Sequence, residues 1–253
     1  MKKVEEISIV GLGLVGQTLA RFYLEKGVKI KQIAVRKLPE NNLYDAQYID
    51  SIKALQAVDL VLICVNDASL MDVVNQIPEG QLTAYTSGAI GLNHFSKREN
   101  LAVFYPLQSF AHLNSEAVAK IPILIESENP TTRARLQEFA LRYFETCREI
   151  NSEKRAQLHL AAVFANNFTN HLIHLAQKLC DENNLSFDLL KPLIAESAQK
   201  WMHISAEKLQ TGPAVRGDWN VIAQHQSLLS EDLRTMYDLM TKSIIRTRKE
   251  QDL

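Results

Sequence analysis

The sequence has few cysteines, no excess of one charge sign and no long apolar run, and each shortage excludes a class of protein. Its three cysteines, Cys64, Cys147 and Cys180, lie far apart, which excludes a disulfide scaffold and a cysteine-based metal site. The 28 basic and 29 acidic residues nearly cancel, so no electrostatic attraction to nucleic acid or to an anionic membrane is expected. The longest apolar run, Leu60–Val65, is far shorter than the ~20 residues of a membrane-spanning helix.

We also expect no export signal in the first residues. Residues 1–6 (MKKVEE) include two acids where a signal peptide needs an apolar stretch. The apolar fraction of 46% and the charged fraction of 23% are those of an ordinary globular protein with enough apolar residues for a core. We therefore expect a cytoplasmic protein that acts on a small molecule.

From Ile7 to about Ile150, short runs of β-branched residues alternate with helical segments, which is typical of βαβ units and a parallel sheet. Strands are predicted at Ile7–Val10, Lys31–Val35, Leu60–Val65, Leu82–Thr86, Leu101–Tyr105 and Ile123–Ile125. Helices are predicted at Ala68–Gln76 and Thr131–Phe144, and an earlier amphipathic helix is expected to end at Gly27.

After Asn151 the strand signals stop, and the rest of the chain has the pattern of helices. Ser152 is a suitable N-cap for a helix that continues to about Asn183. Its apolar positions alternate in steps of three and four over about four heptads: Leu158, Ala161, Ala165, Phe168, Leu172, Leu175 and Leu179. Such a helix is roughly 45 Å long, too long for a compact domain of this size to cover. Further helices are predicted at Leu189–Leu209, at Trp219–Leu229 after a cap at Asp218, and from Glu231 to about Lys249.

The sequence therefore predicts an α/β fold in which a Rossmann domain with a parallel sheet (residues 1–150) precedes an all-helical dimerisation domain (residues 151–253). The long apolar seam requires a partner, and we expect that partner to be a second copy of the chain. The helical domain is also expected to close one side of a substrate cleft.

The first predicted strand leads directly into a glycine-rich turn, Gly11-Leu12-Gly13-Leu14-Val15-Gly16, and then into a helix. This order is the one that the phosphate-binding turn of a Rossmann domain requires. Gly11 permits the tight turn, Gly13 lets the backbone approach a pyrophosphate, and Gly16 allows close packing of helix and strand. Backbone N–H groups at the helix start face the phosphates. The alternative is a turn that merely joins a strand to a helix.

The end of the second predicted strand indicates which dinucleotide is bound. NAD-binding domains place an acidic residue there to accept hydrogen bonds from the ribose, whereas here Val35 is followed by Arg36 and Lys37. Two cations suit a 2′-phosphate, so we predict NADP. The alternative is that both cations are solvated surface residues.

Polar side chains follow two further strands at the edge where ligands bind in open α/β sheets. Val65 and Asn66 end one of these strands and Ser87 ends the other, so they are candidate contacts to the nicotinamide ribose or to substrate. The alternative is that Asn66-Asp67 forms a helix cap and Ser87-Gly88 a turn.

One face of the long predicted helix carries His159, Asn166 and Asn170 within a narrow arc, on a wheel of about 100° per residue, opposite the apolar seam. Histidine exchanges protons near neutral pH, so His159 is a candidate general acid or base for a carbonyl or imine. The alternative is a polar stripe that faces solvent. His171 and His174 have no carboxylate partner in the pattern, so we interpret them as surface residues and predict no metal site.

Several segments together resemble a known family. They are the glycine turn, Val65–Asp67, Thr86–Ala89, Pro106–Phe110, Ala162–Phe168 and Gly212–Asp218. This combination is similar to the NADP oxidoreductases that join a Rossmann-like domain to a helical C-terminal domain, relatives of pyrroline-5-carboxylate reductase, the deazaflavin-dependent NADP reductases and the 6-phosphogluconate dehydrogenase superfamily. The resemblance covers nearly the whole chain and implies the NADP-type fold and a dimer formed through helices. It implies no particular substrate.

The chain departs from these relatives at two positions. Many members carry a histidine where Tyr105 stands, which puts an acid–base role for that position in doubt. Hydroxyacid dehydrogenases carry a catalytic lysine where alignment on Asn166-Asn167 places Val163, which argues against 2-methyl-3-hydroxyacid chemistry.

These inferences combine into an NADP-dependent oxidoreductase that transfers hydride between the nicotinamide and a small carbonyl, imine or deazaflavin partner. Ser87, Gln108, His159 and Asn166 are the candidate residues around the reacting centre. The alternative from another class is an NADP-binding sensor or scaffold dimer without catalysis, since the lysine and the histidine of the relatives are missing.

Overall fold

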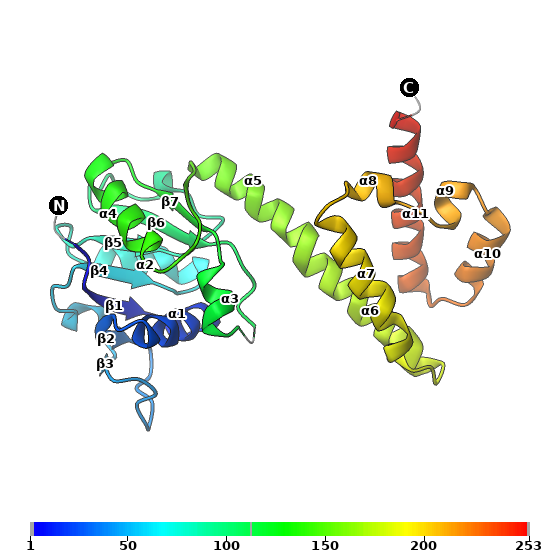
Figure 1. Ribbon diagram of the computed structural model, residues 1–253. Helices are drawn as coiled ribbons and strands as arrows, with labels where there is room; N and C mark the ends of the chain where they lie inside the picture. Colours follow the sequence, from blue (N-terminus) through cyan, green and yellow to red (C-terminus); the bar gives the residue numbers. More distant parts are fainter. Residues whose placement is uncertain (1–2, 112, 252–253) are drawn as a thin grey trace. The chain divides into compact units, whose positions relative to one another are not determined.

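The computed structural model describes residues 3–111 and 113–251, and it divides into two compact units, Met1–Ile173 and His174–Leu253. All the strands belong to the first unit, and the described part of the second unit contains helices only (Figure 1). No helix among the described residues is both long and apolar enough to cross a membrane. Residues 1 and 2, part of the segment in which we expect no export signal, lie outside the described range.

The first unit is built on one eight-stranded sheet with the order β3-β2-β1-β4-β5-β6-β7-β8. The strands are β1 (Glu6–Val10), β2 (Lys29–Ala34), β3 (Gln47–Ile49), β4 (Leu60–Ile63), β5 (Thr83–Tyr85), β6 (Leu101–Pro106), β7 (Ile123–Glu126) and β8 (Cys147–Glu149). Neighbouring strands are parallel from β3 through to β6, as the βαβ pattern predicts. The Rossmann-type α/β fold predicted from the sequence is confirmed.

One strand pair departs from the predicted parallel sheet. β7 runs antiparallel to β6, with Tyr105 opposite Leu124. The described part of the connection between them contains the short helix α3 (Ser115–Ala119) and no longer crossover helix. The chain is therefore not returned to the opposite edge of the sheet, and the next strand runs in the reverse direction. β8 is again parallel to β7, because helix α4 (Pro130–Leu141) provides a full crossover between them.

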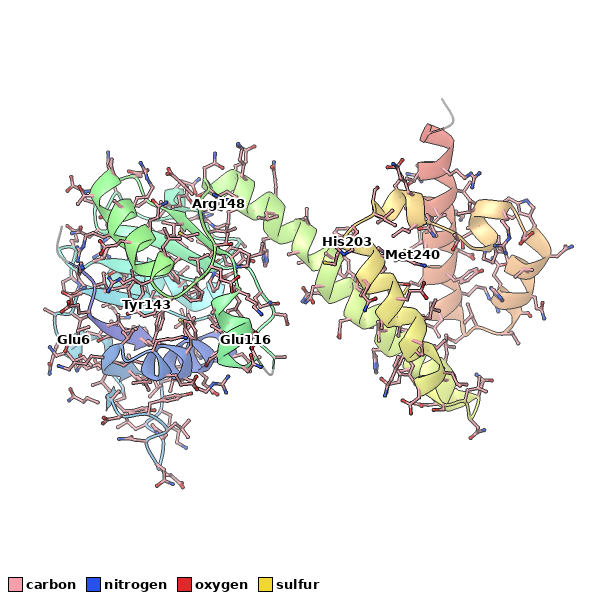
Figure 2. All side chains as sticks on the ribbon, viewed as in Figure 1. Glu6, Glu116, Tyr143, Arg148, His203 and Met240 are labelled. Carbon is pink, nitrogen blue, oxygen red and sulfur yellow. The ribbon has the colours of Figure 1, made fainter. Side chains whose placement is uncertain are left out.

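Both faces of the sheet are covered. On one face, helix α1 (Leu14–Glu25) contributes Phe22 and Tyr23 to an aromatic cluster with Phe139 and Phe144 of the α4 region. Tyr143, labelled in Figure 2, packs edge-on against Tyr23 with ring centroids 5.6 Å apart. On the other face, helix α2 (Asp67–Gln76) buries its apolar side chains against β1, β4 and β5. Gly27, with φ +75°, ends the α1 region in the left-handed conformation, as predicted.

The structure corrects the long helix predicted from Ser152 to Asn183. It consists of α5 (Ser152–Ala162), a π-helical segment η3 (Val163–Phe168) and α6 (Thr169–Glu182). The N-cap of α5 is Asn151, whose Oδ1 accepts a hydrogen bond from the Lys154 N–H, whereas the Ser152 hydroxyl binds Glu126. Ser152 is therefore not the cap, because a carboxylate on β7 attracts its side chain.

The predicted domain boundary at residue 150 stays a prediction. The last strand ends at Glu149, next to that position, and everything after it is helical. The first compact unit nevertheless extends through α5 and η3 to Ile173.

The second unit contains η4 (Phe187–Leu190), α7 (Lys191–Trp201), α8 (Ala206–Leu209), α9 (Pro213–Arg216), α10 (Trp219–Ser227) and α11 (Glu231–Gln251). The single helix predicted at Leu189–Leu209 is wrong. The Met202 and His203 N–H groups bond to carbonyls three residues back, which tightens the last turn and ends α7 before Ser205, the N-cap of α8. Figure 2 labels His203 in the stretch that follows α7.

The residue predicted to cap the next helix also has a different role. Asp218 stands at the N-cap position of α10, but its carboxylate accepts a hydrogen bond from Arg216 Nε at 2.9 Å and makes no side-chain bond to the helix. Gly217, with φ +70°, adopts the left-handed conformation that the turn requires.

Candidate functional site

The glycine turn between β1 and α1 has the geometry of a phosphate-binding turn. Gly11 has φ +94°, and its N–H donates to the Ala34 carbonyl of β2 at 2.8 Å. A Cβ on Gly16 would lie 2.0 Å from the Gly11 carbonyl oxygen, so only glycine fits there, whereas the space beside Gly13 is open. No acidic residue occupies the first turn of α1, which leaves its N-terminal N–H groups suited to an anion.

The three other residues of the turn contribute mainly backbone. Leu12 and Val15 are half-buried and pack against the core, while the Leu14 side chain is exposed. A direct contact of these side chains with a cofactor stays a prediction.

A groove of about 260 Å³ lies beside the glycine turn at the carboxyl ends of β1, β2, β3 and β4. Five residues of the predicted cofactor site line it: Gly11, Gly13, Arg36, Val65 and Asn66. Arg36 extends over the groove and its Nη2 donates to the Ser69 hydroxyl of α2 at 3.2 Å. Lys37 is exposed and is not part of the groove lining.

The groove lining also includes residues that were not predicted as site residues, among them Asp50 and Cys64. Asp50 follows β3, a strand too short for its pattern to be recognised, and brings a carboxylate to the same groove as Arg36. Cys64 directly follows the buried strand β4, and burial raises the pKa of its thiol to about 12, so it lines the groove as a neutral group.

Asn66 and Ser87 both hold their own backbone turns. Asn66 caps α2, with Oδ1 accepting from the Ser69 N–H at 3.0 Å. The buried Ser87 hydroxyl oxygen accepts from the N–H groups of Ala89 and Ile90, at 3.2 and 3.0 Å. These contacts match the alternative interpretation of both residues as cap and turn, and their contact with a cofactor or substrate stays a prediction.

His159 forms a pair with Tyr105, the residue that replaces histidine in this chain. The Tyr105 hydroxyl lies 2.9 Å from His159 Nδ1, and the two rings meet edge to face with centroids 5.9 Å apart. Tyr105 comes from the carboxyl-terminal part of β6 and His159 from α5, so the sheet and the helix meet at this pair. Sequence reasoning missed the pair, because the two residues are 54 positions apart.

Gly88 permits this pairing. A Cβ on Gly88 would lie 2.7 Å from Tyr105 Cζ and 2.8 Å from His159 Nδ1, both shorter than any ordinary contact. The loop after β5 therefore approaches both rings through a bare backbone, which explains a glycine at this position.

A cavity of about 300 Å³ adjoins the pair and is lined by residues of β6, the loop after it, α5 and η3. The predicted residues Gln108, His159 and Asn166 line it together with Tyr105. The structure adds lining residues that were not predicted: Leu107, Ser109, Ala162, Val163, Ala165 and Asn167.

The π-helical segment changes which polar residues share the cavity. The regular wheel places Asn170 with His159 and Asn166, but the cavity takes Asn167 instead. A π turn holds more residues than an α turn, so the 100° spacing fails across residues 163–168.

A buried ion pair fixes α5 against the sheet. Arg155 is fully buried, its Nη1 binds the Glu126 carboxylate, and its Nη2 donates to the Ile90 carbonyl at 2.6 Å. Glu126 also accepts from the Ser152 N–H and hydroxyl at 2.8 to 2.9 Å, and the Ser152 hydroxyl accepts from the Leu92 N–H. These bonds join helix α5, strand β7 and the loop after β5. Arg155 lies four residues before His159 on the same helix, so the ion pair also holds the part of α5 that carries His159.

Residues 3–111 and 113–251 contain no group of three or more His, Cys, Asp or Glu side chains placed to hold a metal ion.

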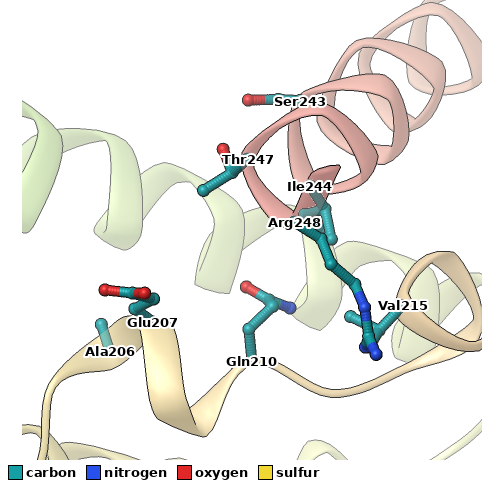
Figure 3. A pocket seen from close by; sticks show the side chains of 8 residues that line it. All are labelled: Ala206, Glu207, Gln210, Val215, Ser243, Ile244, Thr247 and Arg248. Carbon is teal, nitrogen blue, oxygen red and sulfur yellow. The ribbon is translucent and has the colours of Figure 1, made fainter. Parts of the chain in front are cut away.

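The second unit has a separate cavity of about 490 Å³ between α8, α9 and α11, and none of its lining residues was predicted as a site. Figure 3 shows Gln210 directed toward α11 and Arg248 extending beside Val215.

Comparisons with known proteins identify relatives of the whole chain. The family described as "Domain of unknown function (DUF2520)" matches residues 121–244. The chain is 31% identical to a "putative NADP oxidoreductase" from Bacteroides fragilis, a solved structure; the match covers 96% of this chain and 98% of that one, with a TM-score of 0.85. No protein with a curated description matches.

Two more distant solved structures share the fold. A protein from Thermotoga maritima is 24% identical, with 98% and 100% of the two chains covered and a TM-score of 0.72. A pyrroline carboxylate reductase from Plasmodium falciparum, solved with NADP bound, is 15% identical, with 96% and 99% covered and a TM-score of 0.61. At these identities the likeness shows the fold alone.

Proposed function

Because this chain belongs to the family of the Bacteroides fragilis protein, the NADP oxidoreductases that join a Rossmann-like domain to a helical C-terminal domain, we propose that it is an NADP-dependent oxidoreductase. Its substrate in this proposal is a small carbonyl, imine or deazaflavin compound. The observation that supports catalysis most directly is the Tyr105–His159 pair, which adjoins a cavity at the same sheet edge as the glycine turn.

The residues present fit the cofactor. The glycine turn leaves open space beside Gly13 where a pyrophosphate can approach the backbone, and Arg36 stands at the end of β2 where a 2′-phosphate needs a cation. NADPH, when bound, supplies the hydride. Ser69 orients the Arg36 guanidinium, and the N–H groups at the N-terminus of α1 would hold the pyrophosphate.

His159 supplies the proton that accompanies hydride transfer. Hydride adds to the carbon of a C=O or C=N group, and the oxygen or nitrogen then needs a proton. Of the cavity residues, His159 carries an imidazole, the side chain used most often as a general acid or base, while Gln108 and Asn166 offer amides that can hold the substrate by hydrogen bonds.

This proposal is tested by two measurements on the full chain. NADPH binding is followed by titration calorimetry, and NADPH oxidation is followed across small aldehydes, ketones, cyclic imines and an oxidised deazaflavin. We expect binding and turnover with at least one of these classes. Tight binding without turnover of any substrate class would favour a non-catalytic sensor or scaffold. Val163, which stands where hydroxyacid dehydrogenases carry a catalytic lysine, would be consistent with that result.

Cofactor preference provides a direct prediction about Arg36. Charge-assisted hydrogen bonds to a phosphate contribute about 1.5 to 3 kcal/mol, so NADPH should bind roughly tenfold or more tightly than NADH. Arg36→Glu should narrow or reverse this ratio, measured by titration calorimetry. Lys37→Glu makes the same charge change outside the groove lining and serves as the matched control. Equal affinity of the wild-type chain for both cofactors would exclude the assignment.

We also propose that the chain is a homodimer that forms through its helices. Phe164 and Phe168 of η3 and Leu172 of α6 are 63%, 48% and 39% exposed, and such a row of large apolar side chains is unusual on a monomer. The two phenylalanine rings already stack edge to face, 5.0 Å apart, as a preformed contact surface.

Replacing both Phe168 and Leu172 by Asp should therefore split the dimer or unfold the chain, because neither charge could be paired in an apolar interface. Light scattering at micromolar concentration measures the mass. Asn170→Asp adds a charge at an exposed polar position of the same helix and should leave the dimer intact. A monomeric wild-type chain would contradict the proposal.

A further inference from the structure

The direction of the Tyr105–His159 hydrogen bond is tied to the tautomer of the histidine ring. Burial raises the pKa of Tyr105 above its ordinary value, so the phenol keeps its proton at neutral pH. Among the described residues, His159 Nδ1 is the one acceptor bonded to this hydroxyl. A neutral imidazole has one nitrogen that accepts and one that donates. The arrangement in which Tyr105 donates to Nδ1 puts the proton of the neutral ring on Nε2.

The cavity beside the pair offers few other groups that could give a proton to a substrate. Its lining includes no Lys, Arg, Asp or Glu from the described residues, and its other polar groups are the amides and hydroxyl of Gln108, Ser109, Asn166 and Asn167. Amides and aliphatic hydroxyls do not release protons near neutral pH. An N–H at Nε2 of His159 is therefore a donor that can pass its proton to a strong base in the cavity, because Nδ1 can take a replacement proton from the Tyr105 hydroxyl.

We propose that Tyr105 is a positioning residue that holds His159 in the Nε2–H tautomer, so that the ring donates to a carbonyl oxygen or imine nitrogen in the cavity. The inference rests on the proposed function for its use in catalysis, but the tautomer itself does not. It gives Tyr105 a role at a position where many relatives carry histidine.

In the reductive direction, the proton moves from His159 to the substrate and is replaced on the ring from Tyr105. Hydride adds to the substrate carbon, and the electron pair of its double bond moves to oxygen or nitrogen, which takes the Nε2 proton. Nδ1 then takes the phenolic proton of Tyr105 along their hydrogen bond. Water next gives a proton to Nε2, and Nδ1 returns its proton to the phenolate, which restores the Nε2–H tautomer and leaves hydroxide in the solvent. The developing alkoxide or amide anion is a much stronger base than a phenolate, so the transfer is downhill.

The close approach of the Gly88 backbone limits where the Tyr105 and His159 rings can lie. Its backbone lies so near that a single added methyl group would contact Tyr105 and the Nδ1 edge of His159 at once. Gly88→Ala should therefore separate the hydroxyl from Nδ1 without removing either group, which makes it a second way to break the bond.

The tautomer can be read by ¹⁵N NMR of the histidine side chains in the full-length protein, with His159→Gln to assign the signals. In the wild-type chain, the neutral His159 ring should show a protonated Nε2 and an accepting Nδ1. In Tyr105→Phe and in Gly88→Ala the ring should become a mixture of both tautomers. A proton on Nδ1 in the wild-type chain, or an unchanged signal in Tyr105→Phe, would overturn the inference.

The chain offers a matched control for this measurement. His225 and Tyr237 form a second pair in the other unit, with the hydroxyl 3.0 Å from Nδ1. Its signals should respond to Tyr237→Phe and be unaffected by Tyr105→Phe. Any effect of Tyr105→Phe on both histidines would indicate a general disturbance, which would count against a local positioning role.

Kinetics separates this inference from the proposed function. With an active substrate, Tyr105→Phe should lower kcat about 10-fold or more and leave the Kd of NADPH unchanged, since the bond acts on the proton and not on the cofactor. If the wild-type chain shows the expected tautomer but no turnover, the proposed function fails while the hydrogen-bond assignment stands. Turnover with an unaffected Tyr105→Phe kcat would remove Tyr105 from the mechanism.

Discussion

Replacing His159 by alanine should lower the rate of substrate-dependent NADPH oxidation by about 10² to 10⁴-fold, the usual effect of losing a general acid. The affinity for NADPH should be unchanged, because His159 lines the cavity next to Tyr105 and not the groove beside the glycine turn. The loss should therefore appear in kcat while the Kd of NADPH from calorimetry stays constant.

His159→Gln is the informative companion variant. A glutamine oxygen can still accept a hydrogen bond from Tyr105, so the contact between β6 and α5 is kept, but an amide cannot release a proton. We expect His159→Gln to be about as slow as His159→Ala. Activity in either variant within about threefold of the wild-type rate would exclude His159 as the proton donor.

Replacing Arg155 by methionine should reduce the free energy of unfolding by about 3 to 5 kcal/mol, as is typical when one partner of a buried ion pair is removed. Arg155 is fully buried and its partner Glu126 is only 17% exposed, so the variant would leave a largely buried carboxylate with its bonds from Ser152. Urea denaturation followed by circular dichroism measures the change.

The structure supplies two controls for this measurement. Glu126→Gln combined with Arg155→Met removes both charges and should cost less than Arg155→Met alone, because no charge is left buried. Arg133 and Glu149 form a similar pair whose side chains are 30% and 62% exposed, so Arg133→Met should cost roughly 1 kcal/mol or less. Equal losses for Arg155→Met and Arg133→Met would contradict a special role for the buried pair.

The glycine turn was predictable because its requirements are local. Gly11, Gly13 and Gly16 lie within six residues, and the strand before them and the helix after them leave clear periodicities in the sequence. The same holds for Arg36, whose place in the groove follows from its position directly after β2. The confirmed Rossmann-type fold depends on such local patterns repeated along the chain.

The candidate substrate cavity could not be predicted in full, because it depends on contacts between distant elements. His159 was a candidate from its helix face, but nothing in the sequence indicates that Tyr105 lies beside it. The role of Ser152 was misjudged for a similar reason: its best partner is Glu126, 26 positions earlier, and not its own helix. The direction of β7 likewise depends on the path of a connection, which residue patterns do not encode.

The π-helical segment Val163–Phe168 lies within one continuous helical stretch that contributes to two surfaces, the cavity beside His159 and the exposed apolar row of Phe164, Phe168 and Leu172. One extra residue in a turn rotates everything after it by about 100° relative to a regular helix. The apolar residues before this segment and those after it, from Leu158 to Leu172, therefore lie on two differently oriented faces of the helix. They do not form one continuous seam. Deleting a single residue within this segment would restore one regular helix, and Phe168 and Leu172 would then point in new directions while His159 kept its place. The length of this turn thus sets the angle between the cavity and the exposed apolar row.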